Sequence, residues 1–303
     1  MLTMLPDDVG VTTRTVDLGE GPLGVAVLEP PVPGPRTFVA AMGYAASLDP
    51  FELQRFRLLA HVLGARLVVV ETPGCGVRGS RLTAAERWAL LRRSDFRPAA
   101  GRMLAAAAAA DPAAGAAIDA SGAGLGIVGY SLGCSLGTAM AREAGARAGA
   151  AASALVLVEP VAARRWSSRT LLTATRAEDG LVDAALADNA DVVDAVEPWD
   201  RRPEDTSAPH RNRLDMLLLA GALRSGGLPD EVAAAGAGRL VVVHGRDSRY
   251  GLTEAGAALT ARARAAGARA DQLEVAGTHA LWHSLPAVER IGRFVRDALG
   301  DAG

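Results

Sequence analysis

Residues 125–133 read Leu-Gly-Ile-Val-Gly-Tyr-Ser-Leu-Gly. The apolar run Leu125 to Val128 is strand-like, and an alanine-rich helical pattern follows the last glycine. A serine between a strand and a helix lies on a sharp, strained turn, which requires small residues two positions before and after it, here Gly129 and Gly133. The stretch therefore predicts that Ser131 projects from the edge of a sheet, where its hydroxyl group is available for chemistry.

Strand and helix patterns alternate on both sides of this stretch. A hairpin is predicted over 11–18 and 22–28, and short apolar runs at 37–42, 65–70, 154–158, 240–243 and 272–275 predict further strands. Helical patterns cover 50–63, 84–93, 95–110, 132–144 and 284–299. The alternation predicts an α/β fold with a mostly parallel central sheet and helices on both faces. The glycines at 122–126 precede their strand and predict a loop. A dinucleotide-binding glycine motif follows its strand, so these glycines do not indicate such a site.

Residues 163–238 separate two of the predicted strands and far exceed the usual crossover of about a dozen residues. We expect this segment to be a helical cap or lid, inserted into a core domain of residues 1–162 and 239–303. Trp166 and Met216 are its candidate substrate-binding residues. Ordinary packing against the core is the alternative for each of them.

The composition excludes several kinds of function. All 32 basic residues are arginine, so neither a Schiff-base lysine nor a P-loop lysine is present. The formal net charge of -2 argues against a nucleic-acid partner. Cys75 and Cys134 are too few for a disulfide framework and lack the spacing of a zinc site, and we expect neither a metal nor a cofactor.

The sequence shows no signal-like segment at its start and no uninterrupted apolar run of the length that spans a membrane. We therefore expect a soluble, cytoplasmic protein that does not insert into membranes. Its oligomeric state stays open.

A serine hydroxyl becomes a good nucleophile only when a base removes its proton and an acid orients that base. Asp247 follows the strand after the predicted cap, and His279 follows the last strand. Glu159 also ends a strand and is the alternative acid, with Asp247 preferred on position. His283, four residues beyond His279, is expected to line the substrate pocket.

The chain order Ser131, Asp247, His279 resembles that of the α/β-hydrolases, and the resemblance covers nearly the whole chain. Residues 43–44 resemble the loop that supplies one oxyanion donor in that superfamily, and residues 73–76 its proline-glycine turn. Backbone N–H groups of Tyr44 and Leu132 are thereby implied as the oxyanion hole. A methionine at position 42 and a cysteine at position 134 depart from the usual residues, but neither removes a backbone N–H.

What the resemblance implies is a serine hydrolase acting on a small or medium ester, thioester or lactone. Ser131 attacks the carbonyl carbon, His279 shuttles the proton, and Asp247 orients His279. An acyltransferase, a carbon-carbon hydrolase or a perhydrolase could use the same three residues. A non-catalytic binding protein built on this fold is the alternative from a different class.

Overall fold

The computed structural model describes residues 7–76, 80–120, 122–179, 181–191 and 211–300. Eight strands form one sheet in the order β1-β2-β4-β3-β5-β6-β7-β8. The first two strands pair antiparallel, β2 pairs antiparallel with β4, and the remaining neighbours are parallel. The strands are β1 Gly10–Asp17, β2 Pro22–Glu29, β3 Thr37–Ala41, β4 Arg66–Val70, β5 Gly122–Tyr130, β6 Ala152–Val158, β7 Arg239–Gly245 and β8 Arg269–Val275.

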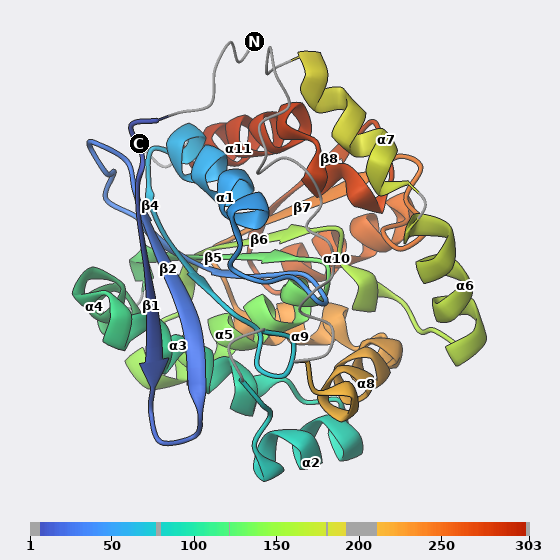
Figure 1. Cartoon of the computed structure of the whole chain (residues 1–303), viewed down its shortest axis with the longest axis horizontal. Helices are drawn as coiled ribbons and strands as arrows, with labels where there is room; N and C mark the ends of the chain where they lie inside the picture. Colours follow the sequence, from blue (N-terminus) through green and yellow to red (C-terminus); the bar gives the residue numbers. More distant parts are fainter. Residues whose placement is uncertain (1–6, 77–79, 121, 180, 192–210, 301–303) are drawn as a thin grey trace.

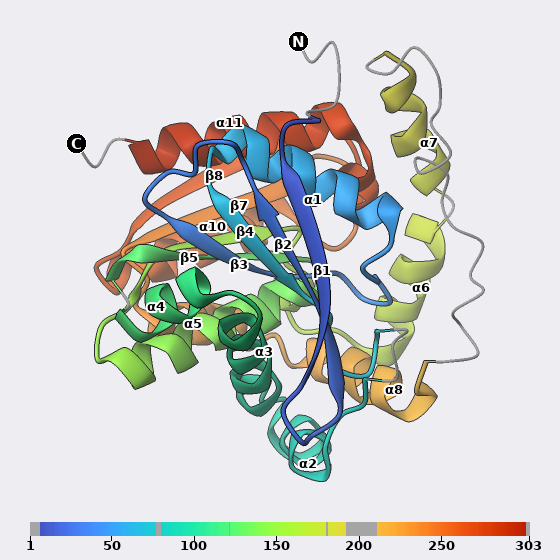
Figure 2. The same cartoon turned by 60° about the vertical axis from the view of Figure 1, so that its left-hand side comes forward.

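Helices cover both faces of the sheet, which is why its central strands are continuous apolar runs rather than alternating ones. On one face lie α1 (Pro50–Leu63) and α11 (Leu285–Gly300), which pack against each other (Figure 1). The opposite face carries α3, α4, α5, α9 and α10, as Figure 2 shows for α3 to α5. Their bounds are α3 Arg97–Ala110, α4 Pro112–Ala120, α5 Leu132–Ala148, α9 Leu228–Ala235 and α10 Thr253–Ala265. The predicted fold class is confirmed.

In its described residues, the long connection between β6 and β7 consists of helices joined by short loops. It contains η1 Val161–Ala163, α6 Ser168–Asp179, α7 Val182–Ala187, η2 Asp188–Asp191, α8 Arg213–Ala222, η5 Leu223–Ser225 and α9. Helix α8 packs on α2 (Ala84–Arg93), and α7 packs on η6 (His279–His283). Helix α9 instead packs on α5 and α10, in the helical layer of the core. Residues 192–210 of the expected cap lie outside the described residues.

Two local predictions differ from the structure. The glycines at 122–126 begin strand β5 instead of forming a loop. A methyl group on Gly126 would overlap the ring of Phe38 on the neighbouring strand, so this glycine allows close packing between strands. Helix α5 also continues past Gly145 to Ala148 and is capped by Gly149, which adopts the left-handed conformation with φ 71°.

Within the described part of the chain, none of the helices is both long enough and apolar enough to span a bilayer.

Candidate active site

Ser131 lies between the end of β5 and the start of α5, on the predicted sharp turn. Its backbone has φ 55° and ψ -114°, a strained conformation for a residue with a side chain. A methyl group on Gly129 would overlap the backbone of Gly133, and one on Gly133 would overlap the carbonyl of Ala41. Both small residues are therefore required by the turn. Ser131 itself is 7% exposed and lies at the carboxyl ends of the parallel strands.

A chain of hydrogen bonds links Ser131, His279 and Glu159. The distance between His279 Nε2 and Ser131 Oγ is 3.0 Å, and that between His279 Nδ1 and Glu159 Oε2 is 2.8 Å. His279 begins η6, directly after the loop that follows β8. A hydroxyl group, an imidazole and a carboxylate are thus within hydrogen-bonding distance, in the order that a nucleophile, its base and an orienting acid require.

Glu159 follows β6 and is 0% exposed. Its backbone has φ 58°, and its N–H donates to the carbonyl oxygen of Val243 on the neighbouring strand, at 2.8 Å. One carboxylate oxygen accepts from the backbone N–H of Gly245, while the other accepts from Ser248 Oγ at 2.5 Å as well as facing His279. These hydrogen bonds satisfy a buried carboxylate and fix its direction.

The prediction that Asp247 orients His279 is contradicted by this geometry. Asp247 is exposed, and its backbone N–H donates to the carbonyl oxygen of Gly277 at 2.9 Å. The turn after β7 directs the next residue, Ser248, toward Glu159 instead. The sequence signal for Glu159 was a single carboxylate directly after a buried strand, and it was the alternative that position alone ranked second.

Two tyrosines hold the imidazole of His279. The ring of Tyr130 stacks on it at 5.5 Å between centroids, and the Tyr130 hydroxyl donates to the His279 carbonyl oxygen at 3.0 Å. Burial, followed by the negative charges of Glu52 and Glu159, raises the pKa of Tyr130 well above its ordinary value, so it remains a neutral donor. The ring of Tyr250 meets the His279 ring edge-to-face, with 4.5 Å between the ring centroids.

The two expected oxyanion donors flank Ser131. Leu132 is the first residue of α5, and helix N-termini carry N–H groups without intrahelical partners. A methyl group on Gly43 would lie 3.8 Å from Ser131 Cβ, so the loop carrying Tyr44 runs beside the serine. The Tyr44 hydroxyl donates to the carbonyl oxygen of Met216 at 3.2 Å, and burial raises the pKa of Tyr44 to about 12.

The three expected substrate-binding residues differ in their surroundings. Trp166 is buried, its indole N–H donates to the carbonyl oxygen of Val161 at 2.8 Å, and its ring meets Tyr250 edge-on at 5.8 Å. Met216 is half-buried on α8, and its side chain packs against the core. His283 is half-buried, with its ring centroid 6.4 Å from that of Tyr130. Within the described residues, the ring of Tyr250 links Trp166 to His279.

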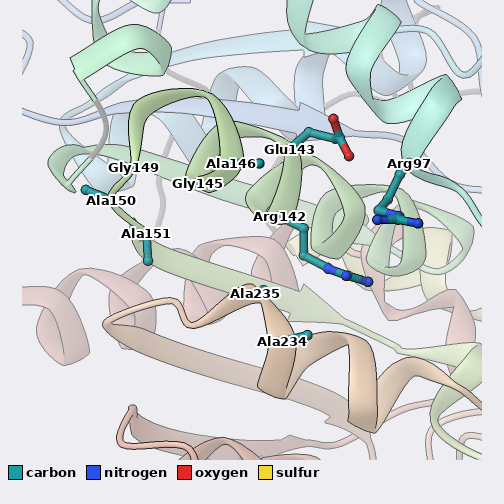
Figure 3. Close-up of a pocket in the computed structure, with 10 residues that line it drawn as sticks. All are labelled: Arg97, Arg142, Glu143, Gly145, Ala146, Gly149, Ala150, Ala151, Ala234 and Ala235. Atoms are coloured by element: carbon teal, nitrogen blue, oxygen red, sulfur yellow. The ribbon is translucent and has the colours of Figure 1, made fainter.

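A cleft of about 410 Å³ lies away from this site, between α5 and α9 (Figure 3). It includes the loop Gly149 to Ala151 that leads into the first residue of β6, and so belongs to the opposite edge of the sheet from Ser131. Its arginines are paired, Arg97 with Asp95 and Arg142 with Glu231. This cleft takes no part in the hydrogen-bonded chain.

Comparison at the level of sequence finds no protein-family model and no curated protein that matches this chain. Solved structures do resemble it. A thioesterase domain from the curacin biosynthetic pathway is 16% identical, covers 94% of this chain and 99% of that chain, and has a TM-score of 0.57. The structure of an arylesterase is 15% identical over 98% of this chain and 87% of that chain, also with a TM-score of 0.57.

A further likeness is to carboxyl esterase 2 from the mycorrhizal fungus Tuber melanosporum. It is 13% identical and covers 97% of this chain and 89% of that chain, with a TM-score of 0.57. At such identities a structural likeness establishes the fold and nothing finer. The chain has the α/β-hydrolase fold, as its sequence resemblance implied.

Proposed function

We propose that the protein is a serine hydrolase that cleaves a small or medium ester, thioester or lactone through an acyl-enzyme. The observation that carries the proposal is the hydrogen-bonded chain from Ser131 Oγ through His279 to Glu159. Its nucleophile lies on a strained turn at the sheet edge, and its acid is buried and held by further hydrogen bonds. A protein that only binds a ligand would need none of this arrangement.

In the first half of the reaction, His279 Nε2 takes the proton of Ser131 while Oγ forms a bond to the substrate carbonyl carbon. The carbonyl oxygen becomes an oxyanion, which accepts hydrogen bonds from the N–H groups of Leu132 and Tyr44. Glu159 holds Nδ1–H and stabilises the imidazolium. His279 then gives its proton to the leaving alcohol or thiol as the bond to the carbonyl carbon breaks.

In the second half, water replaces the leaving group. His279 takes a proton from the water, whose oxygen attacks the acyl-enzyme carbonyl carbon. Collapse of the second tetrahedral intermediate returns the proton to Ser131 Oγ and releases the carboxylic acid. No other cosubstrate is needed for the atoms to balance.

Within the insertion, residues 163–238, the part before α9 is proposed as a cap that shapes the pocket for the acyl group. Support comes from the Tyr44 hydroxyl, which ties the proposed oxyanion loop to α8, and from α7, which packs on η6 beside His279. The names of the similar structures, an arylesterase, a carboxyl esterase and a thioesterase domain, support ester or thioester substrates.

The test combines a serine-directed fluorophosphonate probe with a panel of acyl esters and thioesters of graded chain length. Wild-type protein should be labelled at Ser131 and should hydrolyse part of the panel, and Ser131→Ala should lose both. Ser135→Ala is a matched control, because Ser135 is a buried serine one turn along the same helix. Unchanged labelling of Ser131→Ala, or a wild type that is neither labelled nor active, would overturn the proposal.

A further inference from the structure

One face of helix α6, in the insertion, lies toward His279. Thr175 and Glu178 are three residues apart and therefore project from the same side of the helix. Glu178 is only 5% exposed although it belongs to a segment outside the sheet. A carboxylate buried this far requires partners within the protein.

Both partners of the Glu178 carboxylate are backbone groups of the site. Its Oε2 accepts from the N–H of His279 at 3.1 Å, and its Oε1 accepts from the N–H of Arg249 at 2.8 Å. Glu178 thus bridges the loop after β7 and the loop after β8. The first of these loops carries Ser248, which donates to Glu159, and the second carries His279 itself.

The second contact of α6 reaches the imidazole through one aromatic ring. Thr175 Oγ1 accepts from the Tyr250 hydroxyl at 2.6 Å, and its own hydroxyl donates to the carbonyl oxygen of Leu171 at 2.9 Å. The Tyr250 ring meets His279 edge-to-face at 4.5 Å. Two side chains of one helical turn therefore restrain the backbone and the ring of the same histidine.

We propose that Glu178 is a positioning residue for His279, and that α6 sets the rate of the chemical step as well as covering the site. The inference rests on the proposed function. It follows from geometry: the Ser131 to Glu159 chain requires the imidazole to meet two partners at once, and Glu178 fixes the backbone that places it. Displacements of about 1 Å in such arrangements cost up to about a hundredfold in rate.

The experiment compares Glu178→Gln and Thr175→Val with wild type on a short acyl ester, whose binding needs little of the cap. Glutamine keeps the size of the side chain but places an NH₂ group against one of the two backbone donors. We expect Glu178→Gln to lower kcat by about tenfold to a hundredfold with KM changed less than about threefold. The rate of fluorophosphonate labelling at Ser131 should fall with kcat.

Asp183→Asn is the matched control, because Asp183 is an exposed carboxylate on α7 of the same insertion. It should leave both kinetic constants at their wild-type values. Thermal melts of every variant establish that the protein is folded at the assay temperature.

A folded Glu178→Gln with wild-type kcat, or with a raised KM alone, would overturn the positioning role. If Glu178→Gln does not fold, the test rests on Thr175→Val, since valine keeps the shape of threonine and loses the hydroxyl group that accepts from Tyr250 and donates to Leu171 within its own helix. A loss of kcat of about threefold or more in that variant supports the role, and wild-type kcat refutes it. A wild type that is neither active nor labelled at Ser131 would instead refute the proposed function, and this inference with it.

Discussion

Glu159 and His279 are joined by a hydrogen bond of 2.8 Å between Oε2 and Nδ1, although 120 residues separate them along the chain. The bond exists because β6, β7 and β8 are adjacent parallel strands, so that Glu159 after β6 and His279 after β8 lie at the same end of the sheet. Glu159 donates its backbone N–H to the carbonyl oxygen of Val243 on β7. An acid after β6 or after β7 could thus approach His279, and here the acid after β6 does.

The first prediction concerns the identity of the acid. Glu159→Gln should lower kcat by up to about 10⁴-fold, because an amide can present a donor to Nδ1 and favour the wrong tautomer of His279. Asp247→Asn should change kcat by less than about twofold, since Asp247 is exposed and Nδ1 of His279 is paired with Glu159. Steady-state hydrolysis of one ester by both variants measures the difference. The opposite ranking would return the role to Asp247.

The second prediction concerns the turn that carries Ser131. Gly133→Ala should destabilise the fold by about 3 kcal/mol or more, because the new methyl group overlaps the carbonyl of Ala41 in a packed strand. Gly145→Ala is the matched change in the same helix, where the methyl group would lie 3.7 Å from its nearest neighbours. It should raise stability by up to about 1 kcal/mol through helix propensity. Denaturant unfolding of both variants tests this, and equal effects would contradict it.

The third prediction is a pH dependence of stability. Burial, followed by the negative charge of Asp49, raises the pKa of Glu52 from an ordinary 4.5 to about 7. The folded state therefore keeps a proton that the unfolded chain releases as the pH rises from 4.5 to 7. The free energy of unfolding therefore falls by up to about 3 kcal/mol between pH 4.5 and pH 7 because of this group, and it stays at the lower value above pH 7.

Glu52→Gln should remove this dependence, because glutamine stays neutral and can still accept from the indole N–H of Trp282. The variant is expected to gain stability relative to wild type between pH 5 and pH 8. Free energies of unfolding from urea titrations at the two pH values give the comparison. A difference between variant and wild type that does not change with pH would show that Glu52 is already charged at pH 5.

The fourth prediction concerns substrate choice. Met216→Ala should change the ratio of kcat/KM between long and short acyl esters by up to about tenfold per lost methylene-sized contact. Met216 is half-buried on α8, and its carbonyl oxygen accepts from Tyr44. Leu217→Ala is the control, since that neighbouring side chain is 69% exposed. A chain-length profile of Met216→Ala that stays parallel to that of wild type would favour a role of the insertion in partner binding.

Local features of the fold could be predicted from the sequence because their causes are local. The turn at Ser131 needs glycine two positions away on each side, and for Gly129 the steric reason, the backbone of Gly133, lies within a few residues of the serine. The helix that begins at Pro50 has Asp49 as its N-cap, as its sequence pattern predicts. Alternating apolar runs and helical patterns likewise predicted a parallel sheet covered on both faces, which the structure confirms.

Other features depended on residues that are distant in sequence. The glycines at 122–126 predict a loop from sequence alone. In the structure they belong to a strand, because Gly126 makes room for the ring of Phe38 on the adjacent strand. Glu178 contacts His279, 101 positions further along the chain, and no sequence pattern predicts that contact. Position after the predicted cap favoured Asp247 as the acid, but both candidates follow strands that end on the same side of the sheet. Only the path of each loop decides which carboxylate is buried against the imidazole. Side-chain direction after a strand is set by tertiary packing, whereas the strand itself is set by the run of apolar residues that forms it.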